Sequence, residues 1–105
     1  MLFRSSHYAP YTPLYTGDVI ELIKKFEGNK IAVISFSKLY DGIAPGYQFI
    51  LSPKNDLHEA AKNLFAVLRT IDGLQPDMIL AEIFPDEGIG RAINDRLSRA
   101  RAENK

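Results

Sequence analysis

Apolar residues along this chain fall into short continuous runs and into longer stretches with helical spacing. The two clearest continuous runs, residues 30–36 and 78–83, are apolar almost throughout. Such runs are too short for stable helices and are typical of strands that are covered on both faces of a parallel sheet. Two shorter segments, residues 13–16 and 47–51, predict further strands.

Three other segments carry their apolar residues on one helical face, and they predict helices at residues 19–26, 57–71 and 89–100. The first two follow an aspartate with a glutamate three residues on, Asp18 with Glu21 and Asp56 with Glu59, which is a capping-box pattern. We expect the first helix to end before Gly28 and the second to close at Asp72-Gly73, because glycine suits the left-handed position after a helix.

The predicted order is strand, helix, strand, strand, helix, strand, helix, which indicates an α/β layered domain with a mostly parallel sheet of about four strands. No helix separates the second and third strands, so the direction of the third is left open. Residues 1–13, which include Pro10 and Pro13, predict an extended arm. The domain itself is expected to span residues 14–105.

Composition excludes several classes of chemistry. The 105 residues contain no cysteine, which removes disulfides, thiolate metal sites and a cysteine nucleophile. The two histidines, His7 and His58, are not spaced as metal ligands, and no serine lies in a nucleophile elbow, so we expect neither a metal site nor catalytic residues. The first residues lack the pattern of a signal peptide and no apolar run is long enough to cross a membrane, so we expect a cytoplasmic protein.

Charge gives little reason to expect a nucleic acid. Lysine plus arginine equals aspartate plus glutamate, 13 of each. The last predicted helix is rich in arginine, but Asp95 and Glu103 interrupt it, and cations late in a helix are stabilising in any case. We therefore do not expect direct tRNA binding by this helix.

The loop at residues 82–91 is the one segment that looks like a site, because it follows a buried strand and opens a helix. With the end of the preceding central strand it supplies the candidate ligand-binding residues Ser35, Ser37, Glu82, Glu87, Gly88, Gly90, Arg91 and Asn94. The lysine and hydroxyl pair of a P-loop is missing, and carboxylates would oppose a phosphate. A structural interpretation stands beside this one: the glycines relieve a tight turn, and the acidic residues favour the helix dipole.

Four stretches together resemble a known family: residues 6–10 (SHYAP) with 12–14, residues 51–57, residues 59–72 and residues 81–97, the last containing GIGRAINDRL. Their order and spacing are similar to those of the C-terminal domain of two-domain threonylcarbamoyl-AMP synthases, over essentially the whole chain. The resemblance implies a Rossmann-like domain with helices on both faces of the sheet.

For function, the resemblance implies an accessory domain in tRNA threonylcarbamoyladenosine modification. A separate catalytic domain, in cis or in trans, would make threonylcarbamoyl-adenylate from ATP, L-threonine and bicarbonate, and would hold the ATP and a divalent metal. The arm residues His7, Tyr8, Ala9 and Pro10 would cover its pocket. This chain is then expected to have no cofactor and no catalysis of its own.

Two alternatives remain open from the sequence. The chain could be a small nucleotide- or anion-binding module that uses the strand ends and the loop at residues 82–91. It could also self-associate, because a domain that normally docks on a partner leaves an apolar face to cover.

Overall fold

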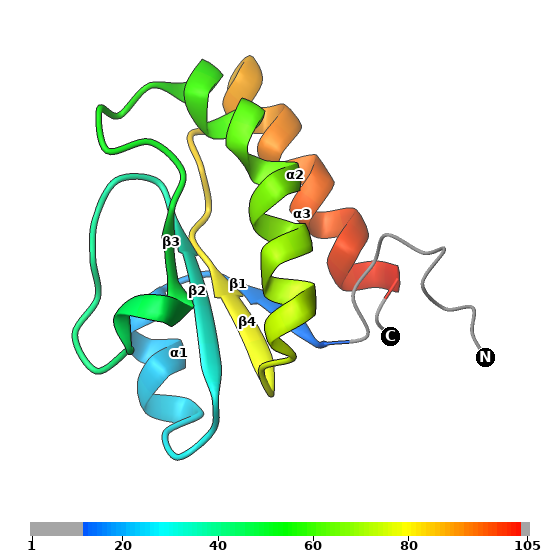
Figure 1. Cartoon of the computed structure of the whole chain (residues 1–105). Coiled ribbons are helices and arrows are strands. Elements are labelled where there is room, and N and C mark those ends of the chain that lie inside the picture. Colours follow the sequence, from blue (N-terminus) through cyan, green and yellow to red (C-terminus); the bar gives the residue numbers. More distant parts are fainter. Residues whose placement is uncertain (1–11, 104–105) are drawn as a thin grey trace.

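Four parallel strands form the central sheet of the computed structural model, which describes residues 12–103 (Figure 1). The strands are β1 (Leu14–Thr16), β2 (Ile31–Ser35), β3 (Gln48–Ile50) and β4 (Met78–Ala81), in the spatial order β1-β4-β2-β3. Every residue of β2 and β4 is buried, as their continuous apolar runs predict. The predicted α/β fold with a parallel sheet is confirmed.

Helices cover both faces of this sheet. Helices α2 (Leu57–Leu74) and α3 (Ile89–Glu103) lie together on one face, and α1 (Val19–Lys25) lies on the other (Figure 1). The two faces follow from the alternation of side chains along a strand. In β2, Ala32 and Ile34 pack in the core beneath α2 and α3, whereas Val33 packs with α1.

The third strand runs parallel to β2, although no α-helix joins the two. The connection is a loop that ends in a short 3₁₀ helix, η2 (Pro45–Tyr47). Its anchor is Gln48, whose side chain accepts from the Tyr40 N–H at 2.7 Å and donates to the Tyr40 carbonyl at 2.9 Å and the Ile43 carbonyl at 3.1 Å. Tyr40 itself is buried against α1. The loop thus fills part of the α1 layer, which a crossover helix would otherwise occupy.

Both predicted aspartate caps are present, and α1 ends at Lys25, before Gly28, as predicted. Asp18 accepts from the Glu21 N–H at 3.3 Å, and Asp56 accepts from the His58 N–H at 2.9 Å. The predicted closure of the second helix at Asp72-Gly73 is wrong, because α2 continues to Leu74 and the left-handed residue is Gln75, with φ of 51°. The amide of Gln75 donates to the carbonyl of the buried Ile71, which closes this last turn.

The predicted arm at residues 1–13 lies almost wholly outside the described residues. Thr12 and Pro13 are described, and the Pro13 carbonyl accepts from the Ile79 N–H at 2.9 Å, which ties the start of β1 to β4. Within residues 12–103, no helix combines the length and the apolar character needed to cross a membrane.

Candidate functional site

Glu82 lies at the carboxyl end of β4, between the carboxyl ends of β1 and β2. Its Oε1 accepts from the Phe36 N–H at 2.7 Å, and its Oε2 accepts from the Tyr40 hydroxyl. The Glu82 N–H also donates to the Ile34 carbonyl at 3.1 Å, which extends the ladder of β4 beyond its last strand residue. Glu82 therefore fastens the loop after β2 to the end of β4.

The environment of Tyr40 keeps its phenol protonated. Burial, the hydrogen bond to Glu82, and the charges of Glu82 and Asp18 all raise the pKa of Tyr40 well above its usual value of 10. A protonated hydroxyl donates to the carboxylate, so the pair acts as one fixed unit in the neutral pH range.

Alkaline pH should weaken this unit. Below pH 10 the phenol is protonated in both folded and unfolded chains. Above pH 10 the unfolded chain loses that proton while the folded chain keeps it, so the free energy of unfolding falls as pH rises. We expect Tyr40 to contribute a loss of up to about 1.4 kcal/mol per pH unit. Urea unfolding of wild type and Tyr40→Phe from pH 8 to 11 measures this, and curves that stay parallel above pH 10 would contradict it.

Ser35 is the last residue of β2, and Ser37 lies on the loop that follows and carries Tyr40. Ser35 is only 1% exposed, and its hydroxyl donates to the Lys38 carbonyl at 2.7 Å. Ser37 is half-buried. The structure thus brings Ser35 and Glu82 together at the carboxyl edge of the sheet, where both hold the loop after β2 in place.

In the segment from the end of β4 into α3, polar groups bond to other groups of the same segment. Asn94 accepts from the Phe84 N–H and donates to the Phe84 carbonyl, both at 2.8 Å. The exposed Arg91 pairs with Asp86, Nε to Oδ1 at 3.2 Å. Glu87 is exposed, and its carbonyl accepts from the Gly90 N–H at 3.0 Å.

The backbone of the turn explains why glycine occupies both candidate positions, Gly88 and Gly90. Gly88 has φ of 54°, a left-handed conformation that favours glycine. At Gly90, an added Cβ would lie 1.9 Å from the Pro85 carbonyl oxygen, so a side chain cannot fit there. These contacts favour the turn interpretation of this loop. They add no free polar group that could support the ligand-binding interpretation.

A buried serine that the sequence analysis did not single out fixes the entry to α2. Ser52 is fully buried, and its hydroxyl donates to Glu59 Oε1 at 2.6 Å and accepts from the Asp56 N–H at 2.8 Å. Asn63 donates to the Leu51 carbonyl at 2.8 Å. Glu59 therefore bonds to Ser52 rather than closing a capping box. In the sequence, the signal for this arrangement was a serine four residues before the predicted capping residue, Asp56.

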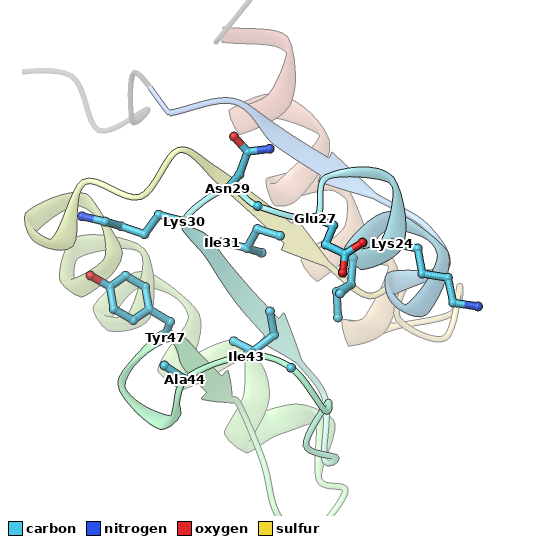
Figure 2. Close-up of a pocket in the computed structure, with 11 residues that line it drawn as sticks. Lys24, Glu27, Asn29, Lys30, Ile31, Ile43, Ala44 and Tyr47 are labelled. Carbon is cyan, nitrogen blue, oxygen red and sulfur yellow. The ribbon is translucent and has the colours of Figure 1, made fainter.

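A hollow of about 340 Å³ opens at the amino end of β2, away from the predicted site (Figure 2). Ile31 and Ile43 line it together with residues from the end of α1 and from the loop before β3. Figure 2 shows the side chains of Lys24 and Lys30 extending in opposite directions, so they do not converge on one anionic group. The lining comes from separate segments, which is why no local motif revealed it.

Metal binding finds no support in the described part of the chain. Between residues 12 and 103, no three histidine or carboxylate side chains are grouped so that they could hold an ion.

Comparison with known proteins decides the family. The family model for the C-terminal domain of threonylcarbamoyl-AMP synthase matches residues 3–102. The chain belongs to this family. The match contains all four stretches on which the sequence resemblance rests.

Two curated synthases show how this domain relates to longer relatives. The chain is 30% identical to the threonylcarbamoyl-AMP synthase of Bacillus subtilis over 102 residues, which is 90% of this chain and 30% of that protein. It is 35% identical to the synthase of Pyrococcus abyssi over 105 residues, which is 90% of this chain and 29% of that protein. The chain thus spans about 30% of the length of these synthases.

Solved structures agree with this synthase-domain fold. The crystal structure of P. abyssi Sua5 complexed with L-threonine superposes with a TM-score of 0.77 at 35% identity, covering 93% of this chain and 30% of that one. A second P. abyssi Sua5 structure, in which a histidine and the tyrosine after it are replaced by alanine, has a TM-score of 0.69 at 32% identity. It covers 91% of this chain and 29% of that one.

The arm residues of this synthase domain, His7, Tyr8, Ala9 and Pro10, lie outside the described residues. The family match includes them, since it starts at residue 3. Their role as a cover therefore stays a prediction from the sequence.

Proposed function

We propose that this chain is the accessory domain of a threonylcarbamoyl-AMP synthase in cytoplasmic tRNA threonylcarbamoyladenosine modification, and that its arm covers the active site of the catalytic domain. The observation that carries the proposal is the family match over residues 3–102, which spans only about 30% of each synthase relative. ATP, L-threonine and a divalent metal would bind the catalytic domain, and tRNA would not contact this chain.

The described residues support a non-catalytic role. Ser35 is buried, Glu82 and Asn94 are half-buried, and each of the three is hydrogen-bonded within the domain. An active site needs a nucleophile, a base and an oxyanion or metal partner that face a common substrate position. Groups that fasten loops to strands do not meet that requirement.

The arm has the chemistry of a cover. His7-Tyr8 is the one histidine-tyrosine pair in the sequence, and Pro10 and Pro13 stiffen the segment around it. A stiff extended segment loses less conformational entropy when it docks than a flexible one. By closing over a bound carbamate or adenylate, the arm would exclude water from a reactive intermediate. In one solved P. abyssi relative, a consecutive histidine and tyrosine were both replaced by alanine, which is the same residue pair as His7 and Tyr8.

Replacing Tyr8 by Ala should lower threonylcarbamoyl-AMP formation about tenfold or more, since loss of about 1.4 kcal/mol of transition-state contact has that effect. The assay would use this chain fused after the remaining part of the P. abyssi synthase. Product formation from ATP, L-threonine and bicarbonate is followed by chromatography. The matched variant Tyr8→Phe keeps the aromatic face and should retain most of the activity.

Thermal unfolding of the 105-residue chain supplies the control, because Tyr8→Ala should leave its melting temperature unchanged. A fusion that makes product at the wild-type rate with Tyr8→Ala would remove the covering role. A fusion in which deletion of residues 1–105 costs no activity would remove the accessory role altogether.

A further inference from the structure

The hollow at the amino end of β2 has an apolar interior. Ile31 lines it and is 7% exposed, and the half-buried Ile23 and Ile43 line it as well. All three pack in the same core cluster, on the α1 face of the sheet. Small-molecule sites are mostly apolar cavities of about 300–1,000 Å³ with a few polar groups. At about 340 Å³, this hollow lies at the lower end of that range.

Hydrogen bonds fix the two walls of the hollow. On the wall that follows α1, the N–H and the side-chain amide of Asn29 both donate to the Phe26 carbonyl, at 3.2 Å and 3.0 Å. On the wall before β3, the Gln48 side chain donates to the Ile43 carbonyl at 3.1 Å. A cavity whose walls are already ordered loses little conformational entropy when it binds a ligand.

The two ends of the hollow differ in charge. Figure 2 shows the side chains of Lys30 and Tyr47 extending toward one side, with the ammonium and the hydroxyl at their tips. Lys24 and Glu27 lie on the opposite side. Both the ammonium of Lys30 and the hydroxyl of Tyr47 can donate to an anionic oxygen, whereas the Glu27 carboxylate disfavours an anion at its own end.

The two donors at the first end have no partner within residues 12–103. No hydrogen bond or ion pair engages the Lys30 ammonium or the Tyr47 hydroxyl there. The backbone of Lys30 is nevertheless held in place, since its N–H donates to Asp77 Oδ2 at 2.7 Å and its carbonyl accepts from the Asp77 N–H at 2.7 Å. Lys30 is thus fixed at the edge of the hollow while its ammonium stays available.

We propose that this hollow binds a small molecule that has an apolar ring and one anionic group, either a carboxylate or a phosphate. The ring lies against Ile31 and Ile43, and the anionic group accepts from the Lys30 ammonium and the Tyr47 hydroxyl. This inference goes beyond the function proposed above. The hollow lies at the opposite edge of the sheet from Glu82, so either proposal can fail without the other.

Amide NMR spectra of the ¹⁵N-labelled 105-residue chain test the site. Two charged probes, naphthylacetate and naphthyl phosphate, share a ring and differ in the anionic group. Naphthalenemethanol supplies the ring without a charge, and inorganic phosphate supplies the anion without a ring. We expect both charged probes to shift the amides of the lining residues with a Kd of about 1 mM or below, and phosphate alone to leave them in place.

Lys30→Gln and Lys24→Gln are matched variants, because each removes one exposed lysine from the lining and changes the net charge equally. Lys30→Gln should weaken binding of both charged probes up to about fivefold, which is the effect of an exposed ion pair. Lys24→Gln should leave it unchanged. Tyr47→Phe keeps the ring, and it should also weaken binding of the charged probes because the hydroxyl is lost.

Equal weakening by the two lysine variants would overturn the proposal, since it would reflect only attraction to a charged surface. The same conclusion would follow if millimolar probe shifted no lining amide, if the uncharged probe bound as tightly as the charged ones, or if phosphate alone gave the same shifts. Tighter binding of one charged probe than of the other would support the site and show which anionic group it takes.

Discussion

Replacing Gly90 by Ala should destabilise the domain by about 3 kcal/mol, at the upper end of the range for overpacked sites. The new Cβ would lie 1.9 Å from the Pro85 carbonyl oxygen and 2.9 Å from its carbon, which are backbone atoms and cannot rotate away. The turn between β4 and α3 must then open, and α3 shifts from its place against the sheet. Urea unfolding of the 105-residue chain measures the change.

Gly73 gives a control of opposite sign. It lies inside α2, has no left-handed φ, and an added Cβ would meet nothing within 4 Å. Gly73→Ala should therefore stabilise the chain by about 0.5–1 kcal/mol, because alanine loses less backbone entropy in a helix. If Gly90→Ala unfolded at the same urea concentration as Gly73→Ala, the close approach of Pro85 would not constrain the fold.

Replacing Glu82 by Ala should cost about 2–4 kcal/mol, since two partly buried donors lose their acceptor and each unsatisfied group costs about 1–3 kcal/mol. The donors are the Phe36 N–H and the Tyr40 hydroxyl. Their loss should free the loop that joins β2 to β3 more than the rest of the domain. Amide hydrogen exchange of that loop, together with urea unfolding, measures both effects.

The variants Glu82→Gln and Tyr40→Phe separate the two bonds. A glutamine carbonyl can still accept from the Phe36 N–H, so Glu82→Gln should cost less than Glu82→Ala. The cycle of Tyr40→Phe with Glu82→Ala isolates the pair, and we expect the two effects to be clearly non-additive. Additive effects would mean that the Tyr40–Glu82 bond contributes nothing to stability.

Local sequence patterns predicted where the residues of the candidate site lie along the chain. They did not predict what each side chain does. The sequence placed Glu82 at the end of a strand and Asn94 within the helix that follows, which the structure confirms. Their partners, Phe36, Tyr40 and the Phe84 backbone, decide what they do. Two of those three partners belong to another connection, and no spacing within the loop could indicate them.

The sequence by itself determined which segments are strands and helices. A strand buried on both faces is apolar almost throughout, whereas a helix buried on one face has apolar residues at helical spacing. It also determined the family, through four stretches in a fixed order. Tertiary structure alone decided the direction of β3 and the partners of Glu82, which lie in the loop after β2. Each of these depends on atoms from segments that meet only when the sheet forms, such as Gln48 with the Tyr40 backbone.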